Sequence, residues 1–139
     1  MKLLPPPGMT SLLCALLATT GSAWGHSNTE RVRPPLTLAC PRDQLTLYGG
    51  EVQRYQRRKG QTQIRINTDW GTTEMVTLRH AGSRDPSAWF LLQGQAFTPE
   101  DWPRIESAPG RLRPRVRVAA WMCDDGRNAT VDWQPPPSP

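Results

Sequence analysis

The sequence predicts an all-β protein, a small antiparallel sandwich or barrel of six to seven strands with at most one short helical turn and one disulfide. Short stretches of alternating apolar and polar residues recur along the chain, which is typical of half-buried strands. Clusters of glycine, proline, asparagine and aspartate separate them about every ten residues, as in small all-β domains. With 139 residues, 15 prolines, 11 glycines and 37% hydrophobic residues, the chain has room for one such domain.

The expected strands follow the alternation and the turn signals between them. They are Gln44–Tyr48, Val52–Arg57, Thr62–Asn67, Glu74–His80, Ala88–Leu92, Leu112–Cys123 and Ala129–Trp133. In the third strand, Ile64 and Ile66 share one face and Arg65 lies on the other, as a period of two requires. Gly49-Gly50 is expected to end the first strand, and Arg58–Gln61 to form a four-residue hairpin loop whose glycine is left-handed. The continuous apolar run from Ala88 predicts a fully buried strand.

One segment carries a helical signal. Thr98-Pro99-Glu100-Asp101 combines a capping hydroxyl, a proline at the first helical position and acids in the first turn. Pro103 lies too deep for a regular helix, because it lacks the N–H that the helix needs there. We therefore expect a single helical turn.

The N-terminus predicts export to the periplasm or the extracellular space. A compact apolar segment, Leu12–Ala18, is followed by small residues of the kind that precede a signal cleavage site. Cleavage before Trp24 and cleavage before His26 both fit, and translation from Met9 instead of Met1 would give a shorter signal.

This interpretation divides the chain into four segments. Residues 1–25 are the expected export signal, 26–39 a flexible lead-in, 40–134 the single β domain and 135–139 a proline-rich tail. No run of 18 or more apolar residues exists, so no conventional transmembrane span is expected.

The cysteines agree with export. Cys14 lies in the expected signal, so the mature chain keeps Cys40 and Cys123, and an even pair in an exported chain predicts a disulfide. This bond closes a loop of about 80 residues, which on the chain-entropy model stabilises the fold by roughly 4–5 kcal/mol.

The basic residues are almost all arginines. The chain carries 17 basic and 12 acidic residues, a net charge of +5, and its only lysines are Lys2 and Lys59. Four arginines recur at every second position of the expected strand Leu112–Cys123, namely Arg111, Arg113, Arg115 and Arg117. Period two places them on one face about 6.5–7 Å apart. The hairpin tip, with Arg54, Arg57, Arg58 and Lys59, forms a second basic cluster.

The arginine row predicts contact with an acidic partner. Guanidinium groups bind carboxylates, sulfates and phosphates in a bidentate manner, and export directs the expectation to an acidic protein, a polysaccharide or a lipid head group. The alternative interpretation is a solvated edge strand whose charges discourage aggregation. Sequence-specific nucleic-acid binding is not expected, since no nucleic-acid-binding motif accompanies the charge. Trp70, in a polar turn, is the expected exposed stacking platform.

The two histidines support a different hypothesis, a small copper-binding protein. Cleavage before His26 would present an amine and an imidazole together, and His80 would add a third nitrogen, a set that suits Cu(II). This arrangement is similar to the histidine brace of copper-dependent polysaccharide monooxygenases and periplasmic copper carriers, which implies a copper cofactor. Without it, no cofactor is expected.

Catalysis is the third hypothesis. No nucleophile elbow, metalloprotease motif or phosphate loop is present, and the sequence singles out no catalytic residue. We therefore predict an exported binding or accessory module rather than an enzyme.

Overall fold

The computed structural model describes residues 33–35, 38, 40–80, 82, 85–127 and 129–137. Its central element is a long bent strand, β1 (Leu45–Arg58), which pairs first with β8 (Arg117–Cys123) and then with β2 (Gln61–Thr68). The other strands are β3 (Thr73–Arg79), β4 (Phe90–Leu92), β5 (Gln95–Ala96), β6 (Glu106–Ala108), β7 (Arg111–Leu112) and β9 (Thr130–Gln134). The short helical elements are η1 (Arg42–Gln44), η2 (Ser87–Trp89), η3 (Pro99–Asp101) and α1 (Trp102–Ile105).

The predicted all-β class is confirmed. The described strands form one seven-stranded sheet, in the order β3-β2-β1-β8-β9-β4-β5, and a two-stranded sheet of β6 and β7. Neighbouring strands are antiparallel except β4 and β9, which run parallel. A parallel pair needs a long connection, and the chain between these strands contains α1 and four further strands, β5 to β8.

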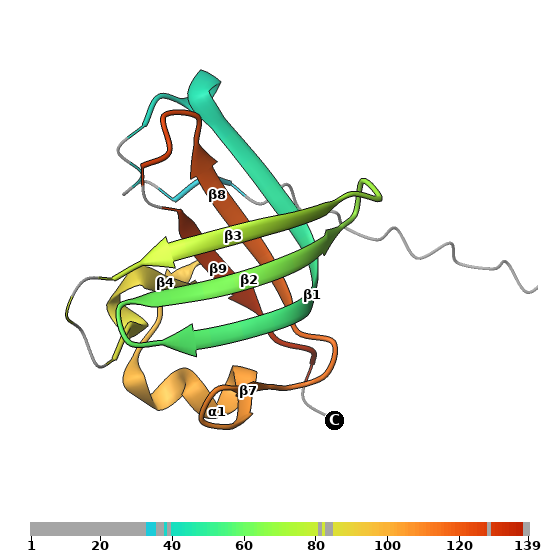
Figure 1. Cartoon of the computed structure of the whole chain (residues 1–139), viewed down its shortest axis with the longest axis vertical. Helices are drawn as coiled ribbons and strands as arrows, with labels where there is room; N and C mark the ends of the chain where they lie inside the picture. The colour runs from blue at the N-terminus through green and yellow to red at the C-terminus, as the bar shows by residue number, and fades with distance from the viewer. Residues whose placement is uncertain are drawn as a thin grey trace, which may run out of the picture. The chain divides into compact units, whose positions relative to one another are not determined.

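The large sheet folds over itself and encloses the core. Figure 1 shows β2 and β3 crossing in front of β8 and β9, with β1 continuing from one layer into the other. Tyr55 of β1 meets Trp133 of β9 edge to face, with ring centroids 5.6 Å apart. The core cluster joins both layers: its members include Ile64, Ile66, Val76, Leu78, Phe90, Val118, Val131 and Trp133.

Gly49 and Gly50 do not end a strand, contrary to the prediction. Both lie inside β1, at the point where its pairing passes from β8 to β2. A Cβ atom on Gly50 would lie 2.1 Å from the backbone oxygen of Asn67. Glycine therefore allows β1 and β2 to approach closely where the sheet bends, instead of stopping the strand.

The hairpin between β1 and β2 is tighter than expected. Only Lys59 and Gly60 connect the strands, and Gly60 takes the predicted left-handed conformation with φ of +80°. The register shifts between Val52 and Arg54. Such a bulge changes which side chains of the following strand face outward.

The predicted long strand Leu112–Cys123 is wrong in its first half. Arg111–Leu112 belongs to β7 in the small sheet, and β8 begins only at Arg117. Pro114 and Arg115 form a turn between them, and Arg115 has a positive φ of 60°. Proline cannot donate to a strand ladder, so the chain turns there.

The predicted helical segment is confirmed, but it is longer than the single turn expected, because Pro103 lies in the first turn of α1, where a missing N–H is tolerated. Thr98 and Asp101 form a capping box, in which both the amide and the hydroxyl of Thr98 donate to the Asp101 carboxylate. Helical structure then runs through η3 and α1, whose Trp102 packs on Phe90 and Phe97.

The apolar run from Ala88 becomes a strand only at Phe90, because η2 occupies the preceding three residues. Phe90 and Leu92 are buried as predicted, although Leu91 between them is only half-buried. Within the described part of the chain, no helix combines the length and apolar character required to cross a membrane. The expected export signal, 1–25, lies outside the described residues, as does most of the expected lead-in.

Candidate functional site

A groove of about 830 Å³ lies on the outer face of the sheet, where β1 and β8 pair. At its centre, Gly49 of β1 lies directly opposite Ala119 of β8. Neither residue carries a side chain larger than a methyl group, so no side chain fills the groove there. The groove is lined by Leu47, Gly49 and Gly50 of β1, Asp69 and Trp70 of the turn between β2 and β3, Arg115, residues Arg117–Ala119, and residues Gln134–Pro137.

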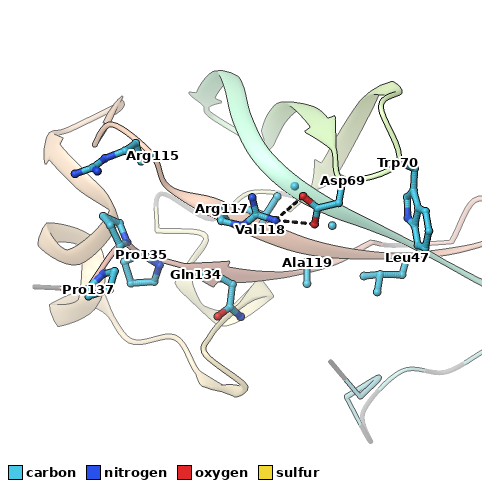
Figure 2. Close-up of a pocket in the computed structure, with 13 residues that line it drawn as sticks. Leu47, Asp69, Trp70, Arg115, Arg117, Val118, Ala119, Gln134, Pro135 and Pro137 are labelled. Carbon is cyan, nitrogen blue, oxygen red and sulfur yellow. Dashed lines mark hydrogen bonds and ion pairs between the residues drawn. The ribbon is translucent and has the colours of Figure 1, made fainter. Parts of the chain in front are cut away.

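The groove is elongated. Figure 2 shows Trp70 and Leu47 toward one end and Arg115, Pro135 and Pro137 toward the other, with Arg117 between them. Three of the five predicted partner-binding residues, Trp70, Arg115 and Arg117, therefore line one groove. This grouping could not be read from the sequence, because Trp70 and the arginines come from distant segments.

Trp70 is the most exposed large apolar side chain among the described residues, at 84%. The turn that carries it is well fixed: the Thr68 hydroxyl accepts from the Thr72 amide, and the Gly71 amide donates to the Thr68 carbonyl. Although the turn is held firmly by these hydrogen bonds, the exposed Trp70 indole contributes little packing to the fold. It does provide a flat surface on which a sugar ring or a peptide side chain can stack.

Two guanidinium groups in the groove have different surroundings. Arg117 donates from Nη2 to both carboxylate oxygens of Asp69, at 2.7 and 2.6 Å, so its charge is largely offset (Figure 2). Arg115 is exposed and has no hydrogen-bond or ion-pair partner among the described residues. Arg115 is therefore the uncompensated positive charge of the groove.

The other two arginines of the predicted row lie elsewhere. Arg113 donates from Nε to the carbonyl of Pro103 at 2.7 Å, and its amide donates to the Ile105 carbonyl. Arg111 lies in β7. The single face of four arginines does not exist, because period-two alternation holds only along a continuous strand and this one is interrupted at Pro114.

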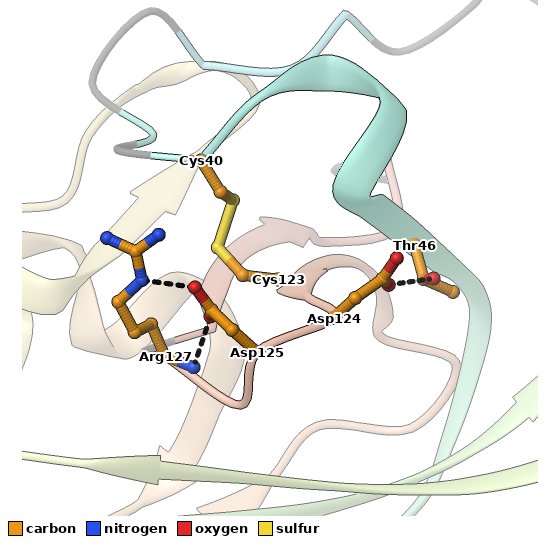
Figure 3. Close-up of a disulfide and its surroundings, with 6 residues drawn as sticks. All are labelled: Cys40, Thr46, Cys123, Asp124, Asp125 and Arg127. Atoms are coloured by element: carbon orange, nitrogen blue, oxygen red, sulfur yellow. Dashed lines mark hydrogen bonds and ion pairs between the residues drawn. A yellow bond between two sulfur atoms is a disulfide. The ribbon is translucent and has the colours of Figure 1, made fainter.

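The predicted disulfide is confirmed. Cys40 and Cys123 are bonded, with Cα atoms 6.1 Å apart, and both are buried. Figure 3 shows the bond joining the segment before β1 to the end of β8, where the Thr46 hydroxyl donates to Asp124 and Arg127 contacts Asp125.

His80, a residue of the copper hypothesis, belongs to the core. It is 1% exposed, its Nε2 lies 3.0 Å from the Thr62 hydroxyl, and its ring lies 6.0 Å from that of Trp89. A metal ion could reach this imidazole only if the surrounding side chains moved apart. His26 lies outside the described residues, and within them no group of three metal-ligating side chains is found.

Sequence reasoning missed a buried ionic cluster centred on Glu106. The carboxylate accepts from the Tyr55 hydroxyl at 2.6 Å, from Arg57 at 3.0 and 2.9 Å, and from the Gly110 amide at 3.1 Å. Burial, together with the hydrogen bond to and the charge of Glu106, raises the pKa of Tyr55 well above its usual range. The only sequence signal was that Tyr55 and Arg57 share one face of a strand.

This cluster is structural. Arg57 lies 4.1 Å above the ring of Trp102, whose indole N–H donates to Asp85. The interactions tie the end of β1 to α1 and β6. Because the Glu106 oxygens are already engaged by four donors, the carboxylate is poorly placed to act as a general base. Arg57, assigned from the sequence to a basic hairpin tip, is instead turned toward this cluster.

Comparison of the chain with protein-family models, with curated proteins and with solved structures gives no match.

Proposed function

We propose that this protein is an exported, non-catalytic binding or accessory module that holds an acidic partner in the groove between Trp70 and Arg115. The observation that carries the proposal is the 84% exposure of Trp70 beside this groove. A protein gains little stability from an indole in solvent, whereas a ligand stacked on it would bury a large apolar surface.

The charges favour an acidic ligand. Arg115 is free to form a bidentate contact with a carboxylate, sulfate or phosphate, and the pairing of Arg117 with Asp69 leaves a net positive charge in the groove. The elongated shape suits an extended segment, such as a stretch of polysaccharide or an acidic peptide, and a lipid head group is the remaining source.

Export is supported by two independent features. The N-terminal segment has the composition of a signal peptide. The buried Cys40–Cys123 disulfide is compatible with an oxidising compartment, where such bonds persist.

The proposal is tested by quenching tryptophan emission with acrylamide. Among the described tryptophans, Trp121 and Trp133 are buried and Trp89 and Trp102 half-buried, so the quencher reaches mainly Trp70. Three probes represent the three sources of acidic groups: a galacturonate oligosaccharide, poly-glutamate and phosphatidylglycerol vesicles. At least one probe should reduce the quenching of Trp70 emission by acrylamide. The contribution of Trp70 is identified as the emission that is lost in a Trp70→Phe variant.

Two variants sharpen the test. Arg115→Gln should weaken binding of that probe about three- to tenfold, the effect of one charge-assisted contact. Arg111→Gln removes the same charge outside the groove and should leave binding unchanged. The proposal fails if no acidic probe protects Trp70, if a neutral oligosaccharide protects it equally, or if the two variants weaken binding alike.

A further inference from the structure

A second basic surface covers the outer side of β1, β2 and β3, the layer that crosses the front of Figure 1. The pairing register arranges nine side chains in three rows. Arg54, Arg65 and Met75 form the first row, Gln56, Gln63 and Thr77 the second, and Arg58, Gln61 and Arg79 the third. We call these nine residues the outer arginine face.

The orientation of the face follows from the core on the other side. Ile64 and Ile66 of β2 and Val76 and Leu78 of β3 are fully buried, so the residues between them point away from the core. In β1, the bulge after Val52 shifts the alternation, so that Arg54, Gln56 and Arg58 face outward beside Arg65, Gln63 and Gln61 of β2.

The outer arginine face has no internal counter-charge. None of its nine residues is acidic, and its four arginines are all exposed. Among the described residues, these four guanidinium groups have no ion-pair or hydrogen-bond partner, whereas four arginines elsewhere each contact a carboxylate. Glu74, opposite Ile66, lies on the other side of the sheet by alternation, and the nearest acid in register on the same side is Glu51, opposite Asn67 and beyond the bulge.

The pairing of Arg54 with Arg65 makes this imbalance more pronounced. The two residues lie directly opposite each other on adjacent strands, an arrangement in which like charges destabilise the sheet. Positions where a sequence departs from such a local rule tend to be functional. A bound anion between the two guanidinium groups would convert this repulsion into two favourable contacts.

We infer that the outer arginine face binds an acidic polysaccharide. Strand geometry spreads its charges over about 10 by 13 Å, enough for several sugar units. The arginines can pair with carboxylate or sulfate groups, and the amides of Gln56, Gln61 and Gln63 can both donate to and accept from sugar hydroxyls.

Single-stranded nucleic acid fits the face less well. Proteins that bind it combine positive charge with aromatic platforms for the bases, and the outer arginine face contains no aromatic residue. It is also separate from the groove beside Trp70, since none of its nine residues lines that groove. The inference therefore stands independently of the proposed function.

The test measures binding of polygalacturonate to the full mature chain by calorimetry at low and moderate salt. Arg54→Gln/Arg65→Gln should weaken binding about tenfold, because each exposed charge contact contributes on the order of threefold. Arg42→Gln/Arg127→Gln is the matched control: it removes the same charge near the disulfide and should leave affinity unchanged. Thermal unfolding of both variants checks that they fold.

The other outcomes separate the two proposals. If Trp70→Ala abolishes polygalacturonate binding and Arg54→Gln/Arg65→Gln does not, the groove is the polysaccharide site and the present inference is wrong while the proposed function stands. Equal weakening by both double variants, or no binding at all, also overturns it. The inference is also wrong if oligothymidylate or phosphatidylglycerol vesicles bind through Arg54 and Arg65 more tightly than polygalacturonate does.

Discussion

Arg57 and Glu106, separated by 49 positions in the chain, form a bidentate ion pair that links the end of β1 to β6. The Glu106 side chain is only 4% exposed and that of Arg57 20%. Tyr55 donates to the same carboxylate, and Trp102 covers the guanidinium. This cluster joins the sheet to the helical segment that packs against one part of the core.

Replacing Glu106 with glutamine should destabilise the protein by about 2–4 kcal/mol, because it leaves the charge of Arg57 in a poorly solvated place without its counter-ion. Denaturant unfolding measures the change. The control is Arg117→Gln, which breaks a half-exposed ion pair and should cost less than about 1 kcal/mol. Similar losses in both variants would contradict a structural role specific to the buried cluster.

Two adjacent glycines should respond differently to alanine. In Gly50→Ala the new methyl group would lie 2.1 Å from the Asn67 oxygen, so β1 and β2 must separate. We expect a loss of about 3 kcal/mol or more. In Gly49→Ala the nearest atom is a carboxylate oxygen of Asp69 at 3.8 Å, and stability should change by less than about 1 kcal/mol. Equal melting temperatures for the two variants would be inconsistent with this close approach.

Arg65→Glu should make the protein more stable. It replaces the like-charge pair with Arg54 by an opposite-charge pair, and cross-strand pairs of this kind contribute about 0.2–1 kcal/mol. The same change should weaken binding of polygalacturonate about tenfold, because it alters the charge of the outer arginine face by two units, as Arg54→Gln/Arg65→Gln does. Arg65→Gln, which only removes the repulsion, should give an intermediate stability. A variant that loses stability would show that Arg65 supports the sheet instead of a ligand.

The Asp132 carboxyl should contribute a free energy of unfolding that decreases as the pH rises. Burial raises the pKa of its carboxyl above the usual range, although hydrogen bonds from Gly94, Gln93 and Gln134 oppose the shift. A carboxyl whose folded-state pKa is raised contributes stability at low pH and loses it as the pH increases through its titration, from about 4 upward.

Asp132→Asn isolates this effect from that of the other acids. The free energy of unfolding of the variant, relative to that of the unchanged protein, should increase between about pH 3 and pH 7. Denaturation curves at several pH values provide the comparison. A relative stability that falls over this range would mean that the hydrogen bond from Gly94 outweighs the burial.

Local signals were sufficient for the fold class and for single elements. The alternation around Ile64 and Ile66, the capping sequence at Thr98 and the cysteine count each depend on neighbouring residues or on chemistry that needs no partner in space. These predictions were confirmed. Gly49-Gly50 misled, because glycine marks a turn and a close strand approach equally well, and only the distance from Gly50 to Asn67 distinguishes them.

The surfaces required the tertiary structure. The arginine row depended on an unbroken strand, and Pro114 with Arg115 interrupts it. Trp70 lines the same groove as Arg115 and Arg117 because β1 and β8 pair in a register that cannot be read from the sequence. The sequence by itself determined an all-β domain with one disulfide and an excess of arginine. Strand register and the bulge after Val52 decided which arginines share a face, because both arise from contacts between segments far apart in the chain.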